Sequence, residues 1–178
     1  TELPEPWQAE VDAARADLLL EPPSAEAFVA LEDWGFDGEA AAMWGHLSGR
    51  ERRRAGKRAT PRDTTLATTR DRLAREDETG VELLPDFPVA WLGQPVAVHD
   101  LPLRTGKLSY AVRWHGARPA LLWDAPADVP LRVSTLDPDW SAPGGAGETL
   151  LAEPPAPLLA MGTTQRDGES IADPGSFA

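Results

Sequence analysis

The chain has 178 residues, about the length of one domain with appendages. Its 18 prolines and 15 glycines predict many turns, and 42% hydrophobic residues are enough for a core. It contains no cysteine, which excludes disulfides, zinc–thiolate sites and a thiol nucleophile. There is no apolar run near the roughly 18 residues of a membrane-spanning helix and no signal-peptide pattern at the N-terminus. We therefore expect a soluble, cytoplasmic protein with no membrane partner.

The formal net charge of −12 is unevenly distributed along the chain. Residues 1–49 carry eleven acidic side chains and one basic, residues 50–75 carry ten basic and three acidic, and residues 76–178 carry fifteen acidic and six basic. A cluster of Arg and Lys can bind nucleic acid by neutralising phosphates, but the acidic flanks would repel a polyanion. We expect no nucleic-acid partner; the basic segment instead packs on the acidic N-terminal helices or on an acidic partner. Its first basic residues are Arg50, Arg52, Arg53, Arg54, Lys57 and Arg58.

The first 47 residues predict three helices. Residues 6–20 form an amphipathic pattern, because apolar side chains recur at spacings of three and four at Trp7, Val11, Ala14 and Leu18. A Pro-Pro pair follows; Ser24 can then cap a second helix, and Gly35 can end it in the left-handed conformation. Asp37 can cap a third helix that ends near residue 47.

Two further helices are predicted before the hydrophobic period changes. Ser48 and Glu51 have the spacing of a capping box, at the start of a basic helix that ends near Arg58. The Thr-Pro pair at 60–61 begins another helix, which runs to about Asp77.

After the Thr-Gly pair at 79–80, apolar residues recur with a period of two, which indicates strands. Strands are predicted over residues 81–84, 95–101, 107–115, 120–124 and 131–136. In the longest of them, Val112 and Trp114 lie on the face expected to be buried.

The sequence thus divides into three parts. Residues 1–77 are a charged helical region, residues 78–152 an antiparallel β-domain and residues 153–178 a flexible Pro/Gly-rich tail. The predicted fold class is α+β: short N-terminal helices, followed by an antiparallel sheet or small β-sandwich that needs a cover.

Several motifs of the β-domain are specific enough to carry a resemblance. They are LLPDFPVAWLGQP at 83–95, VHD at 98–100, LSYAVRWHG at 108–116 and RPALLW at 118–123. These segments resemble the C-terminal β-domain of large actinobacterial proteins built on an (α/α)6 barrel, akin to glycoside hydrolases such as rhamnosidases and glucoamylases. Residues 66–77 resemble the last helix of that barrel, and the resemblance extends to about residue 150.

The resemblance implies a glycosidase-associated β-domain without its barrel. In such proteins the barrel holds the catalytic carboxylates, and the 65 residues upstream are too few to build one. We therefore transfer no catalytic residue. If the short helices cover the sheet, the protein is a self-sufficient monomer; if they do not, a partner should supply the missing surface, either a barrel-containing protein or a second copy of this chain.

Four tryptophans of the β-domain are candidates for stacking on a sugar ring. Trp114 and Trp123 lie on strands and are predicted to face the core, whereas Trp91 and Trp140 adjoin Gly- and Pro-rich loops and are predicted to be exposed. A carbohydrate is therefore a candidate ligand. The candidate ligand-binding residues are Trp91, Trp140, His99, Asp100 and Arg118.

Other chemical signals are weak. Asp86, Asp100 and Asp124 are the acids of the strand region that could converge as a glycosidase pair, but Asp86 and Asp100 more simply cap turns. The three histidines are 53 and 16 residues apart, which matches no metal-ligand spacing. We expect no catalytic residue, no metal and no cofactor.

Two hypotheses of function follow from these observations. In the first, the protein is a non-catalytic binding or interaction module, whose helical region replaces the barrel as cover for the sheet. In the second, it is a small carbohydrate-active hydrolase with a site between helices and sheet. An enzyme should show a deep concavity with converging carboxylates, and an interaction module a shallow surface.

Overall fold

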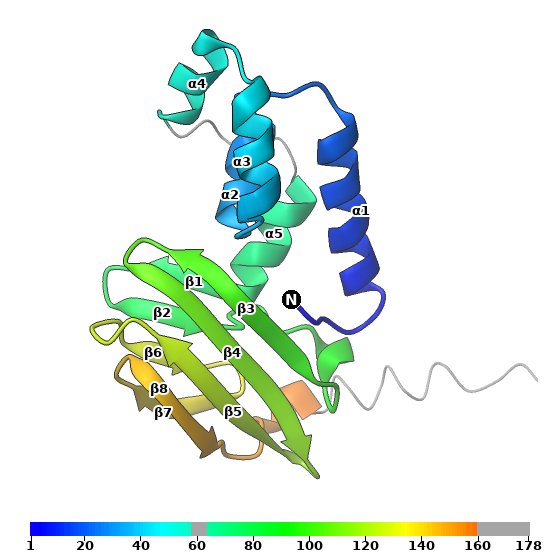
Figure 1. Ribbon diagram of the computed structural model, residues 1–178. Coiled ribbons are helices and arrows are strands. Elements are labelled where there is room, and N and C mark those ends of the chain that lie inside the picture. The colour runs from blue at the N-terminus through cyan, green and yellow to red at the C-terminus, as the bar shows by residue number, and fades with distance from the viewer. Residues whose placement is uncertain (58–63, 160–178) are drawn as a thin grey trace, which may run out of the picture.

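The computed structural model describes residues 1–57 and 64–159, and the fold is α+β (Figure 1). The helices are α1 (Trp7–Leu20), α2 (Ala25–Asp33), α3 (Asp37–His46), α4 (Gly49–Ala55) and α5 (Thr64–Leu73), with a 3-10 helix over Val89–Trp91. The strands are β1 (Ala74–Asp77), β2 (Gly80–Leu83), β3 (Val96–Leu103), β4 (Gly106–His115), β5 (Arg118–Ala125), β6 (Leu131–Val133), β7 (Asp137–Ala142) and β8 (Gly145–Leu150). Within these residues, no helix is long and apolar enough to cross a membrane.

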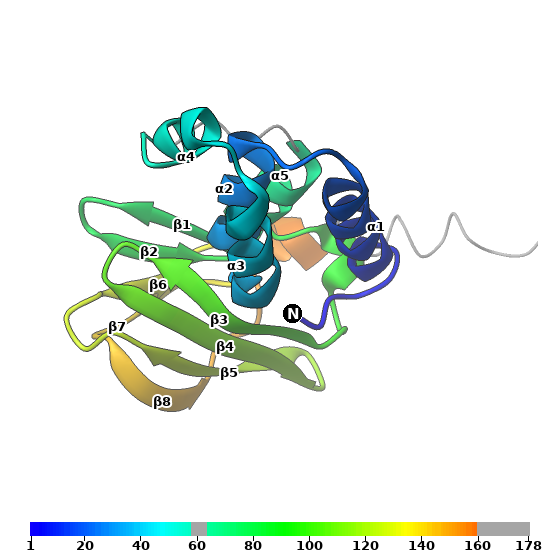
Figure 2. The same ribbon diagram turned by 45° about the horizontal axis from the view of Figure 1, so that its top comes forward.

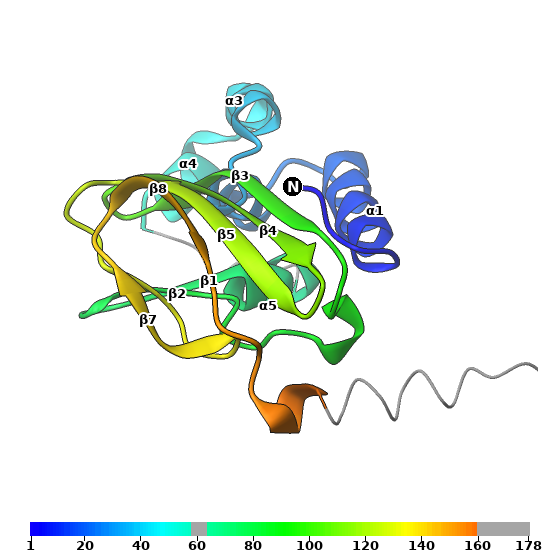
Figure 3. The same ribbon diagram turned by 90° about the horizontal axis from the view of Figure 1, so that it is seen from below.

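The strands form two four-stranded sheets. Sheet A has the order β3-β4-β5-β8 and is antiparallel throughout, whereas sheet B has the order β1-β2-β6-β7 and pairs β2 with β6 in parallel. The two sheets pack face to face as a small sandwich (Figure 3). Buried side chains from both sheets share one core, among them Val98, Leu108, Val112 and Leu121 from sheet A and Val81, Leu83, Leu131 and Val133 from sheet B.

The second sheet corrects the expectation that the helices serve as the cover of the first. Each sheet buries the inner face of the other, and the helical region packs at one edge of the sandwich, beside β1 and β3 (Figures 1 and 2). On α5, the Arg70 guanidinium donates hydrogen bonds to the carbonyl of Asp33 in α2 (3.0 Å) and to that of Pro102 in β3 (2.8 Å). The buried Tyr110 hydroxyl donates to the carbonyl of Leu73 (2.8 Å), and burial raises the pKa of Tyr110 well above its ordinary value.

The predicted signals at the ends of α2 are confirmed. The Ser24 hydroxyl accepts a hydrogen bond from the Ala27 N–H (3.2 Å), and Gly35 follows the helix with φ of +75°. Asp37 behaves differently from the expectation. It is the first residue of α3 rather than its cap, because Phe36 takes the N-cap position.

The capping box predicted for α4 is only half formed. The Ser48 hydroxyl accepts from the Glu51 N–H (3.2 Å), but the Glu51 carboxylate accepts from the N–H of Ala25 (3.0 Å), which belongs to α2. Glu51 therefore joins α4 to the start of α2 instead of closing its own helix. The basic helix ends at Ala55, earlier than predicted, and Arg58 lies outside the described residues.

This arrangement predicts an acid-sensitive contact. The hydrogen bond from Ala25 holds the pKa of Glu51 below its ordinary value, so the ionised carboxylate stabilises the fold at neutral pH. That contribution is lost as the pH falls from about 5 through the folded-state pKa. We expect Glu51→Gln to lower the urea midpoint at pH 7, and we expect its difference from the wild type to shrink as the pH falls below the ordinary pKa of a glutamate. Glu78→Gln, at an exposed position in the β1–β2 turn, is the control and should follow the wild type throughout this pH range.

The last predicted helix is shorter than expected. It ends at Leu73, and Ala74–Asp77 form β1, which pairs antiparallel with β2. The composition of this segment suits a helix, but pairing with β2 buries Ala74 in the core. The Thr-Pro start signal at 60–61 lies outside the described residues.

The chain after residue 136 holds two strands that were not predicted. Their inward positions carry few large apolar side chains, so the period-two signal of β7 and β8 is weak. The first residues of the expected flexible tail are ordered. Residues 156–159 form a helical turn, and Leu158 packs against the core. Residues 160–178 lie outside the described residues.

Candidate interaction site

Trp91 was predicted to be exposed, and that prediction is wrong. Its exposed fraction is 0%, and its ring makes edge contacts with Trp7 of α1 and with Phe87, at centroid distances of 5.6 and 6.1 Å. The 3-10 helix turns the side chain inward, between α1 and the sandwich. Its ring faces are therefore not available to a ligand.

Trp140 is half-buried on β7 and contacts Trp123 of β5 in a T-shaped arrangement, with centroids 5.3 Å apart. Gly147 on β8 leaves room for the Trp123 ring, because a Cβ there would lie 2.8 Å from its Cη2 atom. Trp123 packs against the core as predicted. Trp114 is half-buried rather than buried, and its indole N–H donates to the carbonyl of Gln94 (2.9 Å).

The other three candidates lie toward opposite ends of sheet A. His99 and Asp100 are exposed at a β-bulge of β3, where the Asp100 N–H donates to the Ser109 hydroxyl (2.9 Å). Arg118 begins β5, at the far end of β4, and donates to the carbonyls of Leu151 (2.8 Å) and Leu150 (3.2 Å). The five predicted residues therefore do not form one site.

In the described part of the chain, Asp86 lies apart from the other two candidate acids of the strand region. Asp86 is paired with Arg75, with 2.7 Å between Oδ2 and Nη2. Asp100 and Asp124 lie on either side of Ser109 on the open outer face of sheet A. Among residues 1–57 and 64–159, no three His, Asp or Glu side chains are grouped as metal ligands.

The first part of the basic segment 50–75 forms α4 and the turn after it, and its last part forms α5 and the start of β1. Arg54 pairs with Glu26 of α2 and lies 3.4 Å from Glu51, so part of the segment packs on the acidic helices as expected. Arg52 donates to the carbonyl of Trp44 (3.1 Å), and its guanidinium carbon lies 5.5 Å from the centroid of the Trp44 ring. Three other exposed cations of α4 and the turn after it form no ion pair with any described residue: Arg50, Arg53 and Lys57.

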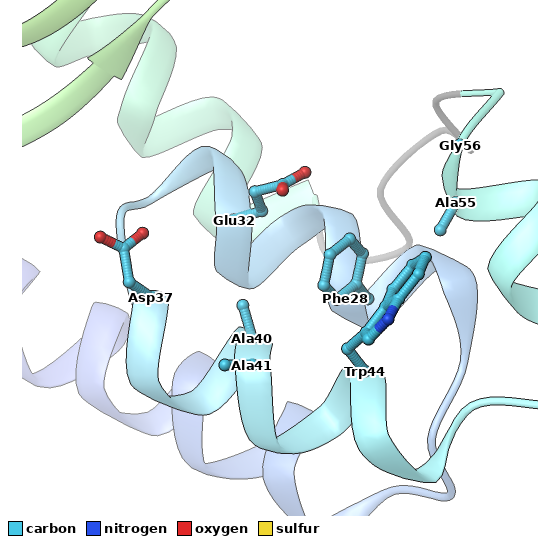
Figure 4. A pocket seen from close by; sticks show the side chains of 8 residues that line it. All are labelled: Phe28, Glu32, Asp37, Ala40, Ala41, Trp44, Ala55 and Gly56. Carbon is cyan, nitrogen blue, oxygen red and sulfur yellow. The ribbon is translucent and has the colours of Figure 1, made fainter.

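A groove of about 550 Å³ runs between α2 and α3 and is closed at one end by the end of α4 (Figure 4). Two alanines of α3 line it, the rings of Phe28 and Trp44 stand at the α4 end, Asp37 stands at the other end, and Glu32 lies between. The two ring centroids are 5.0 Å apart, and Trp44 is 38% exposed. The lining residues are Phe28, Glu32, Asp37, Ala40, Ala41, Trp44, Ala55 and Gly56.

Sequence reasoning did not find this groove. Its residues come from three helices, and none of them belongs to a recognised motif. One signal was available: Trp44 lies in the segment DGEAAAMWGH, where small neighbours cannot cover an indole ring.

Comparison of the chain with protein-family models, with curated proteins and with solved structures found no match. The resemblance to a glycosidase-associated β-domain therefore stays a prediction.

Proposed function

We propose that the protein is a non-catalytic interaction module that binds a partner protein through the groove between α2, α3 and α4. The observation that carries the proposal is the exposed indole of Trp44 in that groove. Large aromatic side chains are enriched among the residues that dominate binding energy at protein interfaces. The resemblance suggests where the module came from, a glycosidase-associated β-domain, and the partner is a barrel-containing protein or a second copy.

The groove is suited to binding because its aromatic end is already ordered. The Arg52 guanidinium packs on the Trp44 ring and is itself held by the carbonyls of Trp44 and Gly45. Phe28 supports the same ring from α2. A preordered anchor loses less conformational entropy on binding.

The alternative function, a small carbohydrate-active hydrolase, has less support. Of the two groove carboxylates, Asp37 is bound to Lys107 (3.0 Å), and this hydrogen bond raises the pKa of Lys107. Asp100 and Asp124 stand on an open sheet face. Carbohydrate binding through Trp91 conflicts with the burial of that ring, and Trp140 offers only part of its ring.

Photo-crosslinking tests the proposal at two matched exposed alanines. A photoreactive residue at Ala41 lies in the groove, and one at Ala146 lies on the outer face of sheet A. In cells that express the protein, we expect protein adducts from position 41 and not from position 146. Adding Trp44→Ala should remove most of the adduct at 41.

Equal adducts at both positions, or none at 41, would contradict binding through the groove. The non-catalytic part is tested separately on purified protein with a panel of aryl glycosides. Release of the aryl group above the buffer rate would overturn it, provided that the activity co-purifies with the 19.2 kDa chain.

A further inference from the structure

The C-terminal end of α1 exposes an apolar pair that nothing in the described fold uses. Leu18 is buried, but Leu19 and Leu20 are 46% and 85% exposed. Two exposed acids, Asp17 and Glu21, flank the pair. Adjacent exposed leucines on one helix end are the kind of surface that marks a protein contact.

The side chains at this helix end are complementary to those of the groove and of α4. Leu19 and Leu20 are apolar side chains that can contact the Phe28 and Trp44 rings. The flanking acids complement three exposed cations of α4 and the turn after it that form no ion pair among the described residues, Arg50, Arg53 and Lys57. The charge pattern of the sequence agrees, since the acidic segment 1–49 directly precedes the basic segment 50–75.

The α1 end and the groove are also placed so that two copies of the chain can contact each other reciprocally. The end of α1 and α4 are at the same end of the helical region, with α2 and α3 between them (Figures 1 and 2). A twofold axis through this end would bring each copy's α1 end to the other copy's α4. Two identical contacts then form together, as in most homodimers.

We propose that the groove is occupied by the α1 end of a second copy, in a closed twofold dimer. The proposal rests on the proposed function and names its partner. Leu20 of each copy lies against Trp44 of the other, and Asp17 and Glu21 face Arg53 and Lys57 across the interface.

A charge-exchange experiment tests the contact without removing any buried residue. The first variant carries Asp17→Lys and Glu21→Lys, and the second carries Arg53→Glu and Lys57→Glu. Each variant alone places like charges in both contacts of its dimer. A mixture forms a heterodimer in which both contacts again join opposite charges, one native and one reversed.

Analytical ultracentrifugation over a concentration series measures the result. We expect a self-associating wild type, a dissociation constant raised at least about tenfold for either variant alone, and recovery of the dimer in the equimolar mixture. Leu20→Ala should weaken the dimer by a similar factor. Glu148→Lys, on the outer face of sheet A, is the control and should leave association unchanged.

Circular dichroism melting of each variant is the control that tests whether the chain remains folded. A wild type that stays at 19.2 kDa at all concentrations, or variants that dimerise like the wild type, would overturn the proposal. An equimolar mixture of the two charge variants that fails to form a dimer would also overturn it. If the groove crosslinks another protein in cells while the purified chain stays monomeric, the second-copy proposal fails and the interaction function stands. If position 41 yields no adduct at all, both fail.

Discussion

Trp91→Ala is expected to lower the free energy of unfolding by about 3–5 kcal/mol, the range for removing a buried tryptophan. The ring is fully buried and contacts Trp7 and Phe87 edge to face, so its removal opens a cavity between α1 and the sandwich. Domains of this size are stable by about 5–15 kcal/mol, so this loss is a large fraction of the total stability and the variant should unfold at a clearly lower urea concentration. Urea unfolding followed by tryptophan fluorescence and by circular dichroism measures the change.

Trp114→Ala is the matched control for this prediction. Trp114 is half-buried and is held by one hydrogen bond to Gln94, so its removal should cost less than that of Trp91. Trp91→Phe should also cost less, because it keeps a ring between α1 and the sandwich. An unfolding free energy for Trp91→Ala within 1 kcal/mol of the wild type, on the order of a surface substitution, would contradict the burial described above.

Gly144→Ala is expected to destabilise the fold by about 1–3 kcal/mol or more, because the new methyl group has no room. A Cβ at this position would overlap the carbonyl oxygen of Pro126 and lie 2.8 Å from its carbonyl carbon and 2.9 Å from that of Ala127. Those atoms are backbone and cannot rotate away. The residue lies in the turn between β7 and β8, so the strain falls where the chain passes from sheet B to sheet A.

Gly45→Ala, near the end of α3, is expected to stabilise the fold slightly. Nothing lies within 4 Å of a Cβ built there, and alanine is favoured over glycine in a helix by up to about 1 kcal/mol. A small rise in melting temperature is therefore expected. If Gly144→Ala melted as high as Gly45→Ala, the close approach of the β7–β8 turn to Pro126 would be wrong.

The sandwich answers the question of what covers sheet A. The resemblance predicted a sheet that lost its barrel and needed another cover. Here sheet B provides that cover, with Leu83 and Leu131 packed in the same core as Leu108 and Leu121 of sheet A. The helical region is therefore free to present a surface of its own, and the groove beside Trp44 is part of it.

Much of the local structure could be predicted because its signals are local. The cap of α2 at Ser24, its glycine stop at Gly35 and the alternation that defines β4 each depend on a few neighbouring residues. The same reasoning assigned the α+β class. It failed at residues 74–77, where composition favours a helix and pairing with β2 decides otherwise.

The candidate site could not be predicted in the same way. Trp91 follows a proline-rich loop, which suggested exposure, but the loop folds inward against α1. Glu51 has the spacing of a capping box, yet its carboxylate binds Ala25 of another helix. Phe28 and Trp44 are sixteen residues apart and meet only because α2 and α3 pack side by side.

The sequence by itself determined the positions of most helices and strands, the charge division and the lack of any cysteine chemistry. These depend on composition and on spacing along the chain. Only the tertiary structure decided which sheet covers which, which tryptophans are exposed and where the groove lies. Those features arise from contacts between residues distant in sequence, and their energies depend on packing that no short segment encodes.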